Sequence, residues 1–201
     1  MTTSRSIHCL FYSHVWSIYQ LETLGLIKTG NELLVELALE SKFAPAFDRD
    51  EARHKGLIEL LQPGAQLHKI AYRPKNLNVP IILASNPPTT VDTLIAALSL
   101  VATVDSLIDE VTVLIHINDG PQFVSAYPLM SDFSIVWDIA DFPSTGLLTL
   151  TESLVKEQCL NKDKWKGLHL CSHPNRQFPD NKLRESILRD LLNDFPALNS
   201  V

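Results

Sequence analysis

The sequence predicts a single α/β domain whose open, mainly parallel β-sheet is flanked by helices in a Rossmann-like arrangement. A short, continuous apolar run at residues 79–84 is typical of a strand that is covered on both faces. Residues 111–117 form the clearest strand pattern in the chain, and Asn118-Asp119-Gly120-Pro121 end it sharply. Between them, apolar residues at helical spacing mark a helix over residues 91–102. A strand, a helix and a strand in this order predict a parallel pair with a right-handed crossover.

The chain of 201 residues fits one domain, which we divide into three parts. Residues 1–75 are expected to be mostly helical. Residues 78–142 are expected to form a strand–helix–strand–strand core. Residues 143–201 are expected to form a mostly helical C-terminal part.

The N-terminal part has the least regular pattern. Residues 7–18 are rich in β-branched and aromatic side chains, which suits either a strand or the lead-in to a helix. Leucines recur at near-helical spacing over residues 20–41, although glycines divide this run into two pieces. The pattern therefore predicts helices over most of residues 20–41.

The other expected elements follow from turn residues and apolar stripes. Residues 48–61 begin with a capping-box pattern, which predicts a helix, and residues 133–139 form a further apolar run that predicts a third core strand. The C-terminal part is predicted to contain a helix at 146–158, a short strand at 165–172 and an amphipathic helix at 180–195.

Composition narrows the class of protein. With a net charge of -6 and a pI of about 5.6, the chain lacks the basic character of a nucleic-acid-binding protein. The three cysteines form no C-x-x-C pair, which favours a reducing, cytoplasmic environment. The longest apolar run, residues 93–104, is well short of the roughly 20 residues of a transmembrane helix.

Short polar side chains follow the predicted core strands and define a candidate binding site. Ligands of open α/β sheets bind beyond the carboxyl ends of the strands, where loops diverge. The polar residues at these ends are Ser85, Asn86, Asn118, Asp119, Asp138 and Asp141. An alternative interpretation is that Asn and Asp stand there only because they end strands readily.

The segment Val79-Pro-Ile-Ile-Leu-Ala-Ser-Asn, a helix, and the segment Val111-Thr-Val-Leu-Ile-His-Ile-Asn-Asp-Gly resemble the start of a nucleotide-sugar glycosyltransferase of the GT-A fold. The resemblance covers about 65 residues. It implies that Ser85, Asn86, Asn118 and Asp119 bind the nucleotide of a nucleotide sugar. In particular, Asp119 would contact the uracil or the ribose.

The same resemblance implies a catalytic and metal-binding role for Asp138 and Asp141, with Mn or Mg as the divalent cation on the diphosphate. The sequence departs from the family here, because no Asp-x-Asp pair follows a strand. Residues three apart on a strand face opposite sides, so Asp138 and Asp141 meet one metal only if the strand ends between them.

A second possible metal site is of the zinc type. His169, Cys171 and His173 alternate, so a strand would place them on one face with nitrogen and sulfur ligands suited to zinc. Cys159 is a candidate fourth ligand. The alternative is that these residues pack in the interior without a metal.

Other catalytic motifs are missing from the chain. It contains no G-x-S-x-G, no G-x-G-x-x-G and no Walker A sequence, which disfavours serine-hydrolase, dinucleotide-binding and P-loop interpretations. The alternative to a glycosyltransferase-like protein is a non-catalytic α/β module for interaction or oligomerisation. Its leucine-rich N-terminal segment and its C-terminal amphipathic helix would then contact a partner or form a homo-oligomer.

Overall fold

The structure is a computed structural model of the chain. It describes residues 6–27, 32–47, 55–75, 77–84, 89–104, 108–138, 141, 145–173, 186, 189, 190 and 193. Six strands, four α-helices and three 3-10 helices follow one another along these residues: β1 (Ser6–Tyr12), η1 (Val15–Gln20), β2 (Glu32–Glu36), α1 (Phe43–Ala46), η2 (Leu57–Leu61), α2 (Leu67–Ile70), β3 (Ile81–Ile82), α3 (Val91–Val104), β4 (Glu110–His116), η3 (Gly120–Leu129), β5 (Asp132–Asp138), α4 (Thr145–Lys156) and β6 (Trp165–Cys171).

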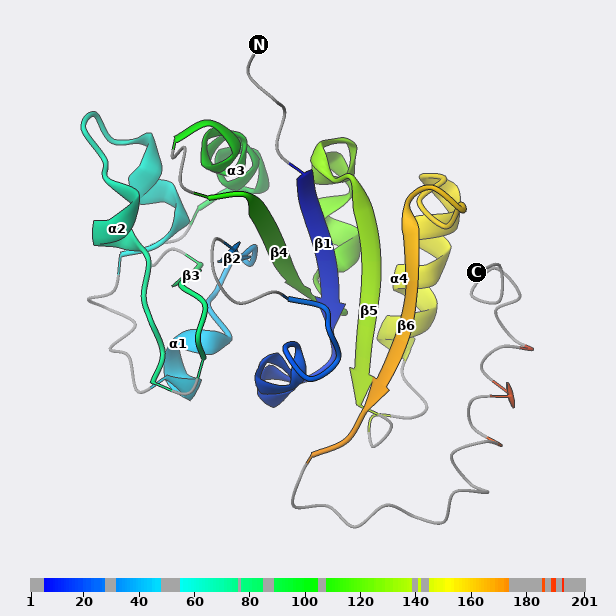
Figure 1. The fold of residues 1–201 in the computed structure, drawn as a ribbon. Coiled ribbons are helices and arrows are strands. Elements are labelled where there is room, and N and C mark those ends of the chain that lie inside the picture. Colours follow the sequence, from blue (N-terminus) through cyan, green and yellow to red (C-terminus); the bar gives the residue numbers. More distant parts are fainter. Residues whose placement is uncertain are drawn as a thin grey trace.

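The six strands form one sheet in the order β3-β2-β4-β1-β5-β6 (Figure 1). Every pair of neighbouring strands is parallel. The α/β class with an open parallel sheet is therefore confirmed. The two strands that flank the predicted crossover helix, β3 and β4, are not neighbours, because β2 lies between them.

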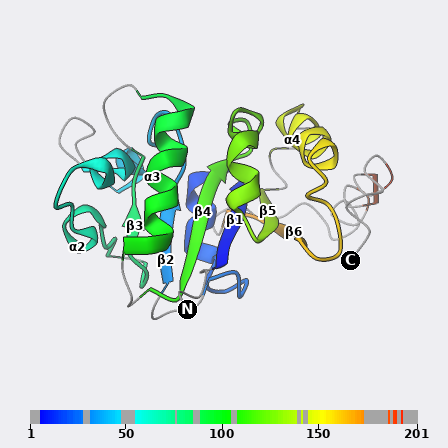
Figure 2. The same ribbon diagram turned by 90° about the horizontal axis from the view of Figure 1, so that it is seen from above.

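One face of the sheet, which we call the helical face, is apolar and covered. Residues of β1, β4 and β5 on this face, such as Phe11, Val113 and Ile135, are fully buried in one hydrophobic cluster. The helical segments α3, η3 and α4 lie in a row along it (Figure 2). Parallel sheets are normally covered by helices, and these three helical segments cover this face.

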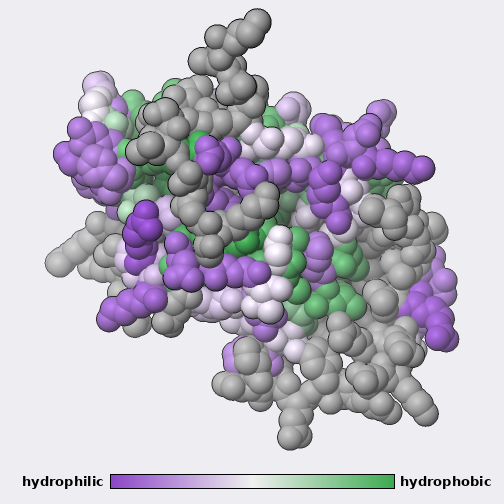
Figure 3. Space-filling view, in the orientation of Figure 1, coloured by the Kyte–Doolittle hydropathy of each residue, from purple (hydrophilic) through white to green (hydrophobic). Residues whose placement is uncertain are grey.

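The opposite face, which we call the front face, is divided into two halves. Its half near the carboxyl ends of the strands packs against η1 and α1 in a second hydrophobic cluster that includes Leu10, Tyr12 and Phe43. The half near the amino ends carries polar side chains instead, and purple polar residues cross this side of the molecule in Figure 3.

The N-terminal part differs from its expected, mostly helical structure. It contributes two strands, β1 and β2, to the middle of the sheet. The leucines of β2 are buried on both faces of a parallel sheet, where consecutive apolar residues are required. A leucine-rich segment can also form the apolar side of a helix, so the sequence alone favoured a helix here. Residues 48–54 of the expected capped helix lie outside the described residues, and the described remainder includes η2.

The predicted core and C-terminal elements agree more closely with the structure. Helices α3 and α4 and strands β4, β5 and β6 overlap the expected segments within a few residues. The expected helix 180–195 lies mostly outside the described residues, and its four described positions are helical. Among the described residues, no helix has both the length and the apolar character needed to cross a membrane.

Candidate functional site

The residue after β1 joins the carboxyl ends of the three central strands. The Ser13 N–H donates a hydrogen bond to the Val136 carbonyl oxygen at 3.1 Å, and the Asp138 N–H donates one to the Ser13 hydroxyl at 2.7 Å. On the other side of β1, the Ile117 N–H donates to the Tyr12 carbonyl oxygen at 2.9 Å. The turn after β1 is therefore held to both neighbouring strands by its own polar groups.

The 3-10 helix η1 follows this turn and packs against the end of the sheet. Ser17, Ile18 and Leu21 are at most 2 % exposed, and Ile18 and Leu21 belong to the same cluster as Tyr12. The Tyr12 hydroxyl is buried and has no hydrogen-bond partner among the residues that the structure describes, and burial raises its pKa. The end of β1 is therefore closed to solvent at this position.

Further contacts attach η1 to the end of β6. The Trp16 and His173 rings meet edge to face with centroids 5.4 Å apart. The Gln20 side-chain amide donates a hydrogen bond to the Ser172 carbonyl oxygen at 3.2 Å. Because these contacts join segments more than 150 residues apart, the turn after β1 and the end of β6 form one packed unit.

His116, the last residue of β4, is held as a neutral imidazole by two hydrogen bonds. Its Nε2–H donates to the Ser13 carbonyl oxygen at 3.2 Å, and its Nδ1 accepts from the Asn118 N–H at 3.3 Å. Burial lowers the pKa of His116, and the nearby Asp119 and Asp141 carboxylates only partly oppose this effect. His116 therefore positions the ends of β1 and β4, with both ring nitrogens engaged.

Glu36, the last residue of β2, is a buried carboxylate that accepts four hydrogen bonds. Its donors are the Ser41 hydroxyl at 2.6 Å and the N–H groups of Lys42, Phe43 and Ala84 at 2.5, 3.1 and 2.8 Å. Burial raises the pKa of Glu36 despite these donors. Clustered main-chain amides of this kind bind anions. Here the protein's own carboxylate occupies them.

The predicted nucleotide-binding residues at the end of β4 lie against other parts of the protein. A Cβ atom on Gly146 would lie 1.8 Å from the Asn118 Oδ1, so the Asn118 amide packs on the first turn of α4. Asp119 precedes η3, and its N–H donates to the His116 carbonyl oxygen at 2.9 Å. Ser85 and Asn86 lie outside the described residues.

The predicted catalytic carboxylates Asp138 and Asp141 come near the same edge of the sheet. Asp138 is 1 % exposed and Asp141 is half-buried. Burial is the main cause that raises the pKa of Cys171 to about 12, and both carboxylates add to it. Within the described part of the chain, no three His, Cys, Asp or Glu side chains are grouped to hold a metal ion. A cation on this carboxylate pair stays a prediction.

The candidate zinc ligands lie in different surroundings. His169 and Cys171 lie on β6, while the His173 ring packs on Trp16. Burial lowers the pKa of His169, and its Nε2 is buried without a hydrogen-bond partner in the described part of the chain. Cys159, the suggested fourth ligand, packs in the helical-face cluster, whereas Cys171 packs in the front-face cluster. The sheet therefore separates Cys159 from Cys171.

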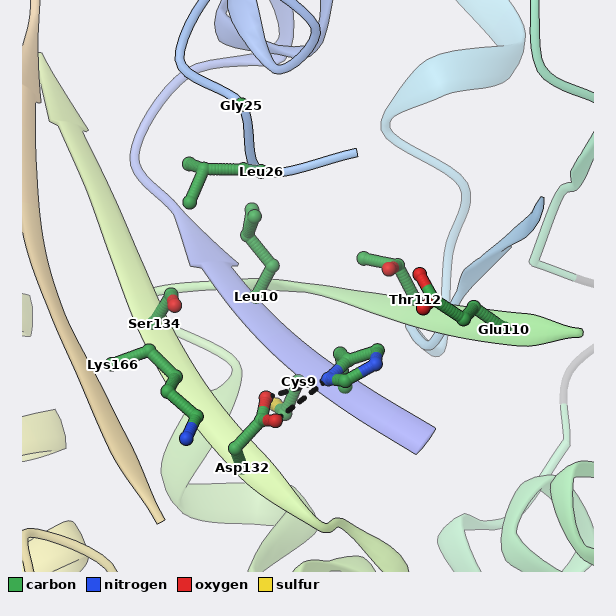
Figure 4. A pocket seen from close by; sticks show the side chains of 10 residues that line it. Cys9, Leu10, Gly25, Leu26, Glu110, Thr112, Asp132, Ser134 and Lys166 are labelled. Atoms are coloured by element: carbon green, nitrogen blue, oxygen red, sulfur yellow. Dashed lines mark hydrogen bonds and ion pairs between the residues drawn. The ribbon is translucent and has the colours of Figure 1, made fainter. Parts of the chain in front are cut away.

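A pocket of about 260 Å³ lies on the polar half of the front face, away from the predicted site (Figure 4). We call it the front-face pocket. Its polar lining comes from four neighbouring strands: His8 of β1, Glu110 and Thr112 of β4, Asp132 and Ser134 of β5, and Lys166 of β6. The backbone of Gly25 and the side chains of Leu10 and Leu26 complete the wall. Sequence reasoning missed this pocket, because its polar residues are spaced along strands whose order was not known.

Two interactions, one partly buried and one fully buried, organise the floor of the front-face pocket. The His8 Nδ1 contacts both oxygens of Asp132, at 2.8 and 2.7 Å. The Thr112 hydroxyl donates to the Glu32 Oε1 at 2.6 Å, and both of these side chains are buried. The Asp132 hydrogen bond is the main cause that raises the pKa of His8.

Comparison with known proteins gives evidence at the level of the fold. No protein-family profile matches the sequence. No curated protein matches it either. The structure, in contrast, is similar to solved ATPase and kinase domains.

Three of these solved structures span most of the chain. The kinase domain of the Escherichia coli tyrosine kinase ETK has a TM-score of 0.61 at 15% identity, covering 90% of this chain and 72% of that one. Cobyrinic acid a,c-diamide synthase from Mycobacterium smegmatis, with bound ADP and magnesium, has a TM-score of 0.62 at 14% identity, covering 95% and 82%. A ParA family ATPase from Chlorobium tepidum has a TM-score of 0.56 at 10% identity, covering 94% and 81%. At these identities the likeness concerns the fold alone.

The fold is therefore similar to that of ParA/MinD-like P-loop ATPases and of kinase domains. The expected resemblance to GT-A glycosyltransferases was wrong, and with it the nucleotide-sugar function. A strand–helix–strand unit with polar strand ends is common to many open α/β sheets, so it could not distinguish the two folds.

Proposed function

We propose that this protein is a ligand-binding protein on a ParA/MinD-type fold that does not perform P-loop nucleotide hydrolysis. The observation that carries this proposal is the turn after β1. It is filled by its own side chains and main-chain hydrogen bonds, as described for Ser13 and η1. The chain would then act by binding rather than by phosphoryl transfer.

A phosphate loop has requirements that this turn does not meet. The P-loop places the sequence G-x-x-x-x-G-K-[ST] between a strand and a helix, so that main-chain amides surround the phosphates. Residues 6–24 contain no glycine. The bulky side chain of Trp16 and the buried Ser17 and Ile18 follow β1 instead. These side chains leave no open main-chain cradle directly after the strand.

A second candidate function is binding of a nucleotide together with a divalent cation at the carboxyl edge. It is favoured by the positions of Asp119, just after β4, and Asp141, just after β5, because both strands pair in parallel with β1 and end at the same edge. Magnesium usually needs only one or two protein carboxylates when phosphates supply other ligands. The neighbour from Mycobacterium smegmatis holds ADP and magnesium. The carboxylates thus suit a cation, whereas the amide cluster near Glu36 is already occupied.

Phosphate release and thermal stability distinguish the two candidates. We expect the purified protein to release no phosphate from ATP above the buffer rate, with or without magnesium. We also expect ATP and ADP to leave the melting temperature unchanged. A nucleotide present at 100 times its Kd would stabilise the folded state by about 2.7 kcal/mol, so binding would be evident.

Two aspartate variants and one control variant identify results that would favour the second candidate or overturn the proposed function. Magnesium-dependent stabilisation by ATP that is lost in Asp119→Asn and Asp141→Asn would support the second candidate. ATP-dependent phosphate release that these variants abolish would overturn the proposed function. Glu152→Gln, on α4, serves as a control carboxylate that faces neither edge nor pocket.

A further inference from the structure

Helix α4, at the end of the row along the helical face, exposes apolar side chains on its outer flank. Leu148 and Val155 are 43% and 52% exposed, and their spacing of seven residues places them on the same side of the helix. A Cβ atom on Gly120 of η3 would lie 2.5 Å from the Leu150 Cδ1, so Leu150 faces η3. The helical period then places Leu148 and Val155 on the opposite flank, away from η3.

Strand β6 adds further apolar side chains next to this flank. Leu168 and Leu170 are only partly buried, and both pack against the cluster of the helical face. β6 ends the described sheet, and Figures 1 and 2 both show α4 beside it. We call the apolar surface formed by Leu148, Val155, Leu168 and Leu170 the outer strip.

The chain continues from β6 into a segment with one apolar and one polar side. The sequence predicts an amphipathic helix over residues 180–195. Its described positions are helical and exposed, and their spacing of i, i+3, i+4 and i+7 places them on one polar face: Ser186, Arg189, Asp190 and Asn193. The helical period puts the apolar residues of the segment on the opposite face: Leu183, Ile187, Leu188, Leu191, Leu192 and Phe195.

The position of this segment in the chain favours it as the occupant of the outer strip. The helical segments α3, η3 and α4 lie along the helical face in the order of the sequence, so the next helix of the chain belongs outside α4. The described positions of the segment, coloured red, lie beyond α4 on the β6 side in both Figure 1 and Figure 2.

The lengths of the elements also agree with this placement. The connection over residues 172–179 can span up to about 27 Å when it is extended, which is enough for the chain to turn back along the sheet. A helix over residues 180–195 would be about 24 Å long, and the seven residues of β6 span about 23 Å. One helix of this length therefore covers the outer strip from end to end.

We propose that residues 180–195 dock as an amphipathic helix on the outer strip of the same chain. The apolar face of this helix covers Leu148 and Val155 of α4 and packs on Leu168 and Leu170 of β6. Its polar face stays exposed to solvent. The outer strip is then an intramolecular docking surface, and the inference does not depend on which ligand the protein binds.

Nuclear Overhauser effects (NOEs) in the full chain test this contact directly. We expect NOEs between the methyl groups of Leu148 or Val155 and the side chains of Ile187, Leu191 or Phe195. A second sample mixes isotope-labelled and unlabelled chains, so that only contacts between two molecules give a filtered signal. We expect no such signal, because the segment docks on its own chain.

A charge placed in the outer strip should release the segment. We expect Leu148→Glu to make the amide hydrogens of residues 183–195 exchange at least tenfold faster than in the unaltered protein, because the helix then loses its apolar partner. Leu61→Glu is the matched control. It changes a leucine of η2 that is 42% exposed and lies outside the strip, and it should leave these exchange rates unchanged.

Substitutions in the segment itself give the reciprocal test. We expect Leu191→Glu, on the apolar face, to shift the methyl NMR signals of Leu148 and Val155. Asn193→Glu, on the exposed polar face, should leave these signals unchanged. Circular dichroism confirms that each variant is folded before the comparison.

Three results would overturn the proposal. The first is that the unaltered protein shows no NOE between the outer strip and residues 180–195. The second is a filtered signal from the mixed sample, which would assign the strip to the segment of a second copy. The third is that the folded Leu148→Glu variant leaves the exchange of residues 183–195 unchanged, which would mean that the segment does not depend on α4.

Discussion

At the scale of single residues, His8 and Asp132 form a pair whose charge depends on pH. The His8 side chain is 32% exposed and that of Asp132 is 13% exposed, so water screens the pair only in part. The hydrogen bond to Asp132 raises the pKa of His8 above its ordinary 6.5, while burial opposes this increase. Glu110 and Glu32 also favour the protonated imidazole. The folded protein therefore binds a proton at His8 more tightly than the unfolded chain does.

We predict that this pair makes the protein less stable as the pH rises through the neutral range. A raised folded-state pKa adds stability that is complete below the unfolded pKa and is lost as the pH passes the folded pKa. The contribution of this pair to the free energy of unfolding should fall by about 1 kcal/mol or less between roughly pH 6 and 8, the size expected for a partly exposed pair. His116 and His169, whose pKa values burial lowers, contribute with the opposite sign, so the contribution of the pair is the difference between the unaltered protein and a variant without Asp132. Urea denaturation at a series of pH values measures this change.

Asp132→Asn is the matched variant for this prediction. It removes the charge while keeping the size of the side chain, so the variant should lose the part of the pH dependence in which stability falls as the pH rises. NMR titration should show that the His8 pKa falls in the variant. An unchanged His8 pKa would mean that Asp132 is not the main partner.

At the scale of elements, the contact between the end of β4 and the start of α4 requires a glycine. The Cβ of any other residue at Gly146 would approach the Asn118 Oδ1 to 1.8 Å and its Cγ to 3.0 Å. Real Cβ atoms do not approach this closely. Either Asn118 or the first turn of α4 would have to move.

We predict that Gly146→Ala destabilises the protein by about 1–3 kcal/mol, the usual cost of overpacking. Asn118→Ala alone should have a smaller effect, because the amide is partly exposed to solvent. The double variant should recover most of the stability that Gly146→Ala loses, since the clash is then removed. Denaturant unfolding of the four proteins in a double-mutant cycle measures this recovery. Additive effects would contradict the proposed contact.

Patterns in the sequence located those elements whose surroundings are uniform. Helices α3 and α4 have an apolar stripe, and β4 and β5 are rich in β-branched and aromatic residues, so their residues alone indicate their type. Strand β2 could not be predicted in this way. It carries a buried glutamate at each end, Glu32 and Glu36, and each is stabilised by partners that are distant in sequence.

The candidate sites were harder to predict than the elements. The edge residues Asn118, Asp119 and Asp138 were expected from turn chemistry, which is local. The front-face pocket depends on the strand order and the register that place His8 beside Thr112 and Asp132. Register is a long-range property, and no spacing along the chain reports it. The glycosyltransferase expectation failed for the same reason, because strand order distinguishes folds that share a local unit.

At the scale of the whole molecule, the sheet has a protected centre and weaker edges. Strands β1 and β4 each have two neighbouring strands, whereas β3 and β6 end the described sheet. β3 consists of only two residues, and a bulge interrupts the pairing of β5 with β6. Local opening is expected where backbone hydrogen bonds have least support.

We predict that amide hydrogens of β1 and β4 exchange most slowly and reach the rate set by global unfolding. Amides of β6 before Leu168 should exchange through local opening at least tenfold faster, because β6 ends the described sheet and these residues lie next to the bulge. Native-state hydrogen exchange at several low denaturant concentrations measures both groups. Equal protection across the whole sheet would show that the edges open only with the centre.

The position of β1 in the sheet also affects how the chain is synthesised. Ser6 of β1 pairs with Glu110 of β4, and His8 pairs with Asp132 of β5. Once it is synthesised, β1 therefore waits until about a hundred further residues have been added before either neighbour exists. At roughly 5–20 residues per second this delay is on the order of 10 seconds. During that time the apolar residues of β1 are without their final partners, and a chaperone that binds nascent chains has its clearest target there.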